Sequence, residues 1–306
     1  MNSFSINTVA DIYTSRGTNT PVSNGTDNFP LISVIIPAHN SSETIGRAIK
    51  SVLHQTYPNI EIVIIDDNSI DNTKEVVETF TRNHSNIYYY ALPFDDPRRF
   101  NKHGKNINAG WMARNFGFTK IKGEWITFQD ADDASLLNRI EAQYNLAQKY
   151  NSNHICVDWQ GLDETIIDTK LDCDKIFAEH PNIIISPKEI MTFVKKTKGI
   201  AMSLFGRFIP FEIKRMKFIN KLFFASLDPY PCASNSPLFK REVIEKVKFR
   251  PRDKRIWPTF VGRGADRDFN FQVAETFKTS YAFKLPLYLW NRGENKEYRE
   301  YDKYII

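Results

Sequence analysis

The sequence predicts an α/β protein whose core is a doubly wound, mostly parallel sheet with helices on both faces. Apolar runs suited to buried strands recur at residues 31–37, 60–65, 87–91 and 125–129, and segments with the apolar spacing of helices separate them. Polar turns follow the first, second and fourth of these runs. Strands that alternate with helices in this way favour parallel pairing through right-handed crossovers.

The composition is that of an ordinary soluble globular protein, since 42% of the 306 residues are hydrophobic and 25% are charged. The formal net charge of +5 suits anionic small molecules or a membrane surface, and it is too diffuse to indicate nucleic-acid binding. The three cysteines lie far apart without a CxxC pair, so neither a disulfide framework nor a zinc site is indicated. A reducing compartment is therefore expected.

Residues 1–29 are expected to form a flexible N-terminal leader, because Ser, Thr, Asn and Gly dominate them and large apolar residues are few. No apolar run approaches the roughly 20 residues that span a bilayer, and the N-terminus lacks the basic and apolar regions of a secretion signal. We therefore expect a cytoplasmic protein. The alternation of strands and helices occupies residues 30–160, and residues 161–306 form a C-terminal portion.

The first three strands each lead into a helix. His39 and Asn40 follow the first strand, and Ser41 or Ser42 can cap a helix with its apolar residues on one face. The second strand ends in Asp66-Asp67-Asn68-Ser69, after which Val76, Val77 and Phe80 indicate a second helix. The third strand leads through a long polar loop to a helix around residues 111–118.

The fourth strand, Trp125 to Gln129, brings three carboxylates to the edge of the sheet, those of Asp130, Asp132 and Asp133. Carboxylates this close repel one another, so a hard cation such as Mg²⁺ or Mn²⁺ is their natural counterion, and such a cation commonly brings a diphosphate with it. The alternative is an acidic turn that caps a helix beginning near Ser135.

Residues 37–40, 66–69 and 130–133 should meet in one crevice, because ligands of such sheets sit beyond the carboxyl ends of the strands. These turns contain neither GxGxxG nor GxxxxGK[ST], so a bound phosphate would be held by metal. Asp67 could accept a hydrogen bond from the imide N–H of a pyrimidine, and Asp130 could bind ribose hydroxyls. For Asp66 and Asn68 the alternative is a role in turn geometry.

The C-terminal portion should contain a strand at residues 154–159 and a helix that starts with Ser186-Pro187-Lys188-Glu189. The acidic triplet at 172–174 follows no strand and is assigned to the surface. Residues 201–224 combine an apolar helical face with five basic residues, which predicts either peripheral contact with an anionic membrane or packing on the protein's own core.

A further strand at residues 237–239 and a helix at 240–247 precede the segment Gly262 to Phe271. Glycines before a carboxylate let the loop turn sharply and present Asp266 at a helix start, where the helix dipole favours its ionised form. Asp266 is therefore a candidate general base, with helix capping as the alternative role. Asp268, further into the helix, is the competing candidate for the base, although its position favours a surface salt bridge.

The chain resembles the family 2 glycosyltransferases of GT-A fold over about residues 31–290. The segments that carry this resemblance are Val34-Ile35-Ile36-Pro37-Ala38-His39-Asn40, Asp66-Asp67-Asn68-Ser69, Ala113-Arg114-Asn115-Phe116-Gly117, Gly123-Glu124-Trp125-Ile126-Thr127, Asp130-Ala131-Asp132-Asp133 and Gly264-Ala265-Asp266. The resemblance implies that residues 30–160 form the nucleotide-sugar-binding half and residues 161–306 the acceptor-binding half of one GT-A domain.

The resemblance also implies a hexosyl- or N-acetylhexosaminyltransferase that inverts the anomeric centre and uses Mn²⁺ or Mg²⁺ with a UDP-sugar donor. By position in the motifs, Pro37, His39 and Asn40 line the nucleotide pocket, and Asp67 meets the uracil. The remaining roles follow in the same way: Asp130 on the ribose side, Asp132 as direct metal ligand, Arg114 beside the diphosphate and sugar, and Asp266 as catalytic base.

The chain departs from the family pattern at two positions: His39 stands where tyrosine is frequent, and Ala265 stands where glutamate is usual. Ala265 favours one alternative, a nucleotide-sugar-binding protein that has lost catalysis. The other alternative is a nucleotidyltransferase, which would need a basic triphosphate loop near the first strand, whereas Pro37 to Ser42 contains no Lys or Arg. The acceptor is left open among a polysaccharide, a lipid-linked saccharide and a protein glycan.

Overall fold

The computed structural model describes residues 29–96, 99, 108–197, 213, 216, 230–257, 264–291 and 304–306. Apart from Phe29, the expected leader lies outside these ranges. The amphipathic segment 201–224 also lies outside them, except for Ile213 and Met216. Within the described ranges, none of the helices has the length and hydropathy that a bilayer span requires.

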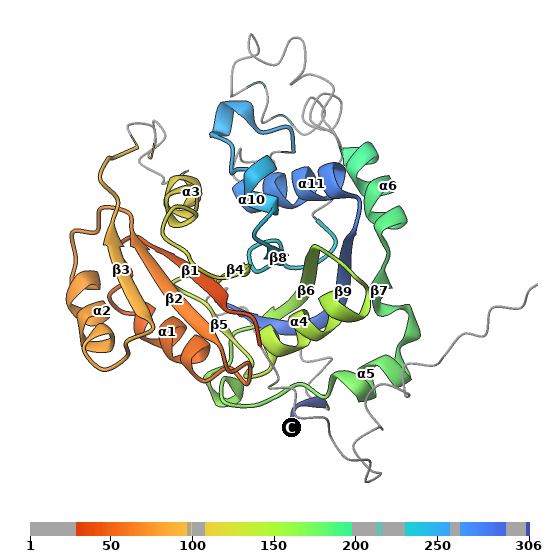
Figure 1. The fold of residues 1–306 in the computed structure, drawn as a ribbon, viewed down its shortest axis with the longest axis horizontal. Helices are drawn as coiled ribbons and strands as arrows, with labels where there is room; N and C mark the ends of the chain where they lie inside the picture. The colour runs from red at the N-terminus through yellow and green to blue at the C-terminus, as the bar shows by residue number, and fades with distance from the viewer. Residues whose placement is uncertain are drawn as a thin grey trace, which may run out of the picture.

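A single sheet of nine strands organises the protein, in the order β3-β2-β1-β4-β8-β6-β9-β5, with β7 paired to β9 (Figure 1). The first four strands along this order are all parallel, as predicted. β8 is antiparallel to both β4 and β6, whereas β6 and β9 are again parallel. The strands are β1 (Ile32–Ala38), β2 (Ile60–Asp66), β3 (Ile87–Ala91), β4 (Trp125–Phe128), β5 (Ala134–Ser135), β6 (His154–Gly161), β7 (Ile184–Ile185), β8 (Leu238–Lys240) and β9 (Ser280–Trp290).

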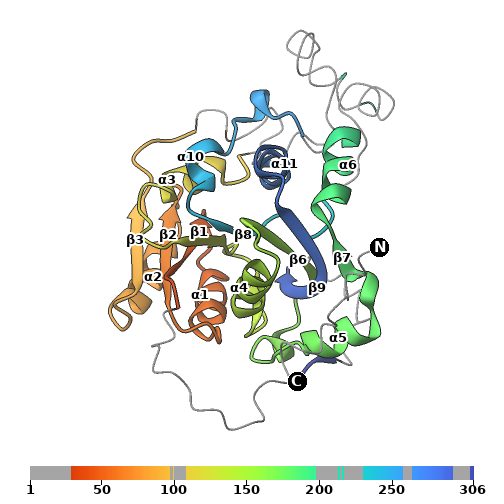
Figure 2. The same ribbon diagram turned by 45° about the vertical axis from the view of Figure 1, so that its right-hand side comes forward.

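Helices cover both faces of this sheet, as expected for a doubly wound fold (Figures 1 and 2). Side chains of β1 alternate between two cores: Val34 and Ile36 pack with α1, α2 and α4 on one face, and Ile35 packs with α3, α10 and α11 on the other. The helices are α1 (Ile45–Leu53), α2 (Thr73–Thr81), α3 (Trp111–Gly117), α4 (Arg139–Lys149), α5 (Cys173–Glu179), α6 (Pro187–Thr197), α10 (Val243–Lys246) and α11 (Ala265–Phe277).

Two predicted helix starts are wrong. Thr44, not Ser41 or Ser42, precedes the first residue of α1, and no side chain caps that helix. The backbone carbonyl of Ser41 accepts from the Ile45 N–H at 2.9 Å instead. The helix expected near Ser135 begins at Arg139, because Ala134 and Ser135 pair with β9 as the short strand β5.

Other predicted elements are confirmed. Ser186 and Glu189 exchange hydrogen bonds at the start of α6, since the Ser186 N–H donates to Glu189 Oε2 at 2.8 Å and the Glu189 N–H donates to Ser186 Oγ at 3.4 Å. The helix expected at 240–247 is shorter than predicted: residues up to Lys240 belong to β8, and α10 occupies Val243–Lys246.

Candidate active site

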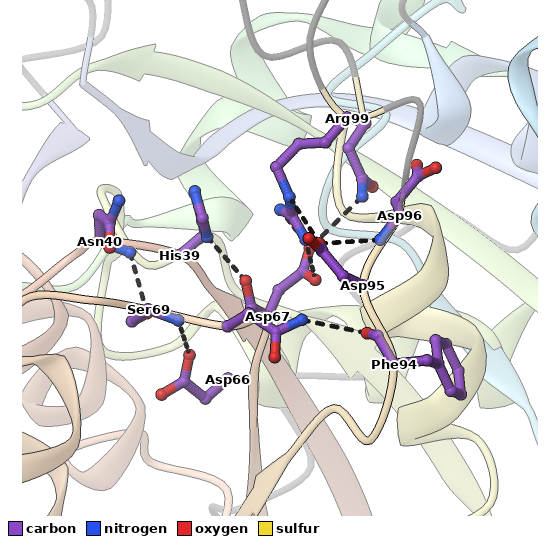
Figure 3. Close-up of polar contacts among 11 residues, drawn as sticks. His39, Asn40, Asp66, Asp67, Ser69, Phe94, Asp95, Asp96 and Arg99 are labelled. Carbon is purple, nitrogen blue, oxygen red and sulfur yellow. Dashed lines mark hydrogen bonds and ion pairs between the residues drawn. The ribbon is translucent and has the colours of Figure 1, made fainter.

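The ends of β1 and β2 are tied together by hydrogen bonds between their polar turns (Figure 3). His39 Nδ1 lies 2.7 Å from the carbonyl oxygen of Asp67, so this nitrogen carries the proton and donates it. The Asn40 N–H donates to Ser69 Oγ at 2.9 Å, and Asn40 Oδ1 accepts from the Ile70 N–H at 2.8 Å. Pro37 is half-buried and lies opposite Ile65, one residue before the end of β1. The predicted nucleotide-pocket residues Pro37, His39, Asn40 and Asp67 therefore lie at one edge of the sheet.

Asp67 forms a buried ion pair with Arg99, which sequence reasoning did not select (Figure 3). Two guanidinium nitrogens donate to the two carboxylate oxygens of Asp67, at 2.9 and 2.5 Å. Arg99 Nη2 also lies 3.2 Å from the carboxylate of Asp95, which is exposed. Burial opposes ionisation of Arg99, but the hydrogen bonds and negative charges of Asp67 and Asp95 together outweigh it and raise the pKa of the guanidinium. The pair places a fixed acceptor and a fixed cation beside the first two strand ends.

Asp66 and Asn68, the neighbours of Asp67, shape the turn after β2, which is the alternative role predicted for them. Asp66 Oδ1 accepts from the Ser69 N–H at 2.8 Å, and Asp66 Oδ2 accepts from the Tyr89 hydroxyl at 2.6 Å. Asn68 has a left-handed backbone with φ of 57°, a conformation that asparagine tolerates better than most residues. These two side chains hold the loop, whereas the carboxylate of Asp67 pairs with Arg99.

The acidic turn after β4 gathers three carboxylates, those of Asp130, Asp132 and Asp133, whose oxygens lie within 4.8 Å of one another. Asp133 is 1% exposed and accepts from the Tyr288 hydroxyl at 2.7 Å and the Asn291 N–H at 2.8 Å. The Asp130 N–H donates to the same tyrosine oxygen at 3.1 Å. The side chain of Asp132 is exposed to solvent.

This donor set fits a hard divalent cation. Burial, and then repulsion from Asp130, raises the pKa of Asp133 to about 8. The pKa of Asp132 is also raised: its side chain reaches solvent, but the protein around it limits its hydration, and Asp130 repels its charge. The ionised forms of Asp132 and Asp133 would be stabilised by a dication, and carboxylate oxygens are the ligands that Mg²⁺ and Mn²⁺ prefer. Asp133 was not selected as a site residue from the sequence, although it belongs to the same acidic run.

Arg114, in α3, is 5% exposed and lies beneath the acidic turn. Its Nη2 donates to Asp130 Oδ1 at 2.5 Å, and its Nη1 donates to the carbonyl oxygen of Ala109 at 2.7 Å. The guanidinium also sits about 5.5 Å from the centre of the Phe128 ring, within the range of a cation–π contact. The observed contact of Arg114 is thus with Asp130, whose carboxylate it fixes at the mouth of the strand.

Asp266 lies in the first turn of α11, as predicted, after Gly264 with a left-handed φ of 80°. The Ser234 hydroxyl donates to Asp266 Oδ2 at 2.8 Å, and Asn270 Nδ2 donates to the Asp266 carbonyl oxygen at 2.9 Å. Helix capping is not its role, because no side chain caps α11. The half-buried carboxylate of Asp266 thus lies in the first turn of α11, with Ser234 as its hydrogen-bond donor.

Asp268 forms a salt bridge, as expected, but its side chain lies in the interior and not at the surface. The side chain of Asp268 is fully buried, and it pairs with Arg250 Nε at 2.8 Å. It also accepts from the backbone N–H groups of Ile256 and Trp257, at 2.8 and 3.0 Å. Its partners come from residues 250–257. This segment has no apolar periodicity, so nothing in its sequence predicts that it folds back over α11. Asp268 thus anchors this segment, which separates its role from that of Asp266.

Comparison with protein families identifies the part of the chain that contains these strand ends. The model described as "Glycosyl transferase family 2" matches residues 33–172, which include β1, the acidic turn and β6. Residues 33–172 are thus identified as a glycosyltransferase family 2 region.

Relatives within the family align over part of their length. Glycosyltransferase GlyG of Streptococcus pneumoniae serotype 4 is 32% identical over 135 residues, which cover 44% of this chain and 41% of GlyG. The UDP-Glc:alpha-D-GlcNAc-diphosphoundecaprenol beta-1,3-glucosyltransferase WfgD of Escherichia coli is 36% identical over 124 residues, 40% of this chain and 42% of that protein. The alignment thus spans less than half the length of either relative.

Solved structures show the same GT-A architecture. Residues 1–349 of TarS from S. aureus superpose with a TM-score of 0.52 at 15% identity, over 85% of this chain and 60% of that one. The same TarS fragment has been solved with UDP and with UDP-GlcNAc, with TM-scores of 0.51 and 0.50 to this chain. At this identity the likeness shows the fold of the family 2 enzymes and not their specificity.

Proposed function

We propose that the protein is an inverting, metal-dependent glycosyltransferase that moves a sugar from a UDP-sugar to a hydroxyl group of a saccharide or glycoconjugate. The observation that carries this proposal is that the clustered carboxylates of the acidic turn and Asp266 belong to one hydrogen-bonded site, joined through Ser234 and Asn235. Inversion needs one metal site and one base, and these four carboxylates supply both.

The nucleotide would occupy the edge formed by β1 and β2. Asp67, held by Arg99, accepts a hydrogen bond from the imide N–H of uracil, while Pro37, His39 and Asn40 line the pocket. Two comparisons support uridine: the E. coli relative is named for UDP-Glc, and the TarS fragment was crystallised with UDP and with UDP-GlcNAc.

Asp132, the exposed carboxylate of the cluster, would hold the metal directly, with Asp133 completing the donor set and Asp130 directed to the ribose side. A bound Mn²⁺ or Mg²⁺ would neutralise charge on the departing diphosphate. Arg114 keeps Asp130 in place through its 2.5 Å hydrogen bond. Asp266 takes the proton of the acceptor hydroxyl as that oxygen bonds to the anomeric carbon, while the bond from that carbon to the diphosphate breaks on the opposite face.

For the acceptor we propose a lipid-linked saccharide, which would place the protein at the membrane surface in the cytoplasm. The relatives WfgD of E. coli and the GalNAc(5)-diNAcBac-PP-undecaprenol beta-1,3-glucosyltransferase of Campylobacter jejuni both carry undecaprenol-linked saccharides in their names. Residues 201–224 are the candidate for peripheral contact, and loss of liposome flotation in a Lys214→Glu, Lys217→Glu variant would support it.

The first test measures thermal stability with each nucleoside diphosphate, with and without Mn²⁺, in the wild type and in Asp132→Asn. Ligand at about a hundred times its Kd stabilises a protein by about 2.7 kcal/mol, which a thermal scan resolves. We expect a shift with UDP that requires both Mn²⁺ and Asp132. The matched control is Asp174→Asn, an exposed carboxylate outside the site, which should keep the full shift.

The second test separates catalysis from binding. Asp266→Asn should abolish turnover of the donor and retain the UDP shift. Unchanged turnover would remove Asp266 as the base. A wild type that binds UDP with Mn²⁺ but turns over no UDP-sugar with any saccharide acceptor would favour the binding protein that has lost catalysis. A thermal shift with nucleoside triphosphates only would favour a nucleotidyltransferase.

A further inference from the structure

Two consecutive residues, Ser234 and Asn235, connect the two halves of the candidate active site. The Ser234 hydroxyl donates to Asp266 Oδ2 at 2.8 Å. The Asn235 side-chain amide donates to Asp130 Oδ2 at 3.1 Å and to Asp133 Oδ2 at 3.3 Å. The proposed base, on α11, and the proposed metal carboxylates, after β4, are thus separated by a single peptide unit. These halves lie more than a hundred residues apart in the sequence.

The backbone around this pair is held by three separate elements. The Ala233 N–H donates to the Val157 carbonyl of β6 at 3.0 Å, and the Ser234 carbonyl accepts from Asn270 Nδ2 of α11 at 2.6 Å. On the other side, the carbonyl of the fully buried Ser236 accepts from Gln143 Nε2 of α4 at 2.8 Å. The pair therefore sits on a rigid support, although it belongs to no helix or strand.

The chemistry of each side chain matches its partner. Ser234 occupies one oxygen of Asp266, and within the described part of the chain Oδ1 of that carboxylate accepts no hydrogen bond, which leaves it available to accept a proton. Asn235 offers a neutral amide to two carboxylates. It offsets their repulsion without bringing a positive charge that would compete with a dication, as an arginine or lysine would.

We infer that Ser234 and Asn235 form a positioning pair that sets the geometry between the general base and the metal-binding carboxylates. The inference rests on the proposed function. Ser234 orients Asp266 toward the acceptor hydroxyl, and Asn235 orients Asp130 and Asp133 for the cation. Neither residue is a catalytic residue, because each acts through a carboxylate.

The experiment compares Ser234→Ala, Ser234→Thr, Asn235→Ala and the exposed control Ser85→Ala by two readouts. The first is the Mn²⁺ concentration that gives half of the UDP-dependent thermal shift, which needs no turnover. The second is kcat and KM for the donor. Because groups that orient metal ligands are worth about 10- to 100-fold in metal affinity, we expect Asn235→Ala to raise the Mn²⁺ midpoint by at least about tenfold.

Ser234→Ala should lower kcat by about tenfold or more, while the Mn²⁺ midpoint and KM for the donor stay unchanged. Ser234→Thr keeps the hydroxyl, so it should retain most of the wild-type kcat. Asn235→Ser replaces the alanine variant if that one does not fold. A wild-type Mn²⁺ midpoint in the folded Asn235 variant, or a wild-type kcat in Ser234→Ala, overturns the inference alone. A wild type with neither a Mn²⁺-dependent shift nor turnover overturns the proposed function as well.

Discussion

The buried histidine His154 should make the protein lose stability between about pH 6.5 and pH 4. Its side chain is fully buried at the start of β6, with Nε2 2.8 Å from Asn270 Oδ1 and Nδ1 2.9 Å from Ser280 Oγ. The asparagine oxygen can only accept, so Nε2 carries the proton and Nδ1 accepts from the serine hydroxyl. The imidazole is therefore held neutral, with both nitrogens used.

The size of the effect follows from the shift in its pKa. Burial lowers the pKa of His154 from 6.5 to about 4, and the hydrogen bond with Asn270 opposes this only in part. Between these two values the unfolded chain binds the proton and the folded chain does not, so the free energy of unfolding falls as the pH falls. At about 1.4 kcal/mol for each pKa unit, the full loss is about 3 kcal/mol, of which about 2 kcal/mol occurs between pH 7 and pH 5.

The assay is urea unfolding, followed by tryptophan fluorescence, of the wild type and His154→Gln at pH 7 and pH 5. Glutamine can still donate to Asn270 but does not titrate. Asp132 and Asp133, whose pKa values are raised, contribute a pH dependence of the opposite sign that is common to both proteins and cancels in the comparison. The wild type should lose about 2 kcal/mol more than the variant over this interval. Equal losses in the two proteins would refute a neutral, buried His154.

Three further predictions concern packing and the metal site. Gly123→Ala should be more destabilising than Gly117→Ala in urea unfolding. A Cβ at 123 would lie 2.7 Å from two backbone atoms near the start of β1, which cannot move aside easily. A Cβ at 117 would meet the movable side chain of Ile35 at 2.9 Å, and overpacking of this kind costs about 1–3 kcal/mol. Asp268→Ala should cost about 3 kcal/mol or more in the same assay, because it removes the acceptor of the partly buried Arg250 and of two backbone N–H groups, and a loss below 1 kcal/mol would contradict this. Tyr288→Phe should keep the fold but weaken Mn²⁺ binding about tenfold in the thermal-shift titration, since it removes the hydroxyl shared by the acidic turn; an unchanged midpoint would show the hydroxyl to be structural only.

The parallel half of the fold was predictable because its signals are local. Continuous apolar runs and the turns that follow them placed β1, β2, β3 and β4 and their shared edge, and the strand ends do bring Asn40, Asp67 and Asp130 to that edge. The acidic run also predicted the carboxylate cluster to which Asp132 belongs.

The predictions that failed concern residues whose structure depends on partners distant in the sequence. Ser135 is in a strand because Tyr288 pairs with it, and Asp268 is buried because Arg250 and the backbone of 256–257 fold over it. Ser234 and Asn235 lie in an irregular segment where no periodicity marks a role. Arg99 was one of several basic residues in a polar loop, and only its buried contact with Asp67 distinguishes it.

The antiparallel pairing of β8 with β4 has a consequence for synthesis on the ribosome. Trp125 pairs with Lys240 and Ile126 with Phe239, so roughly 115 residues are translated between the two strands. At 5–20 residues per second, β4 waits about 6 to 23 s as the exposed edge of a nascent parallel sheet. An unpaired edge of this kind invites pairing with other chains, so a pause or truncation before residue 240 should make the nascent chain prone to aggregation and dependent on chaperones.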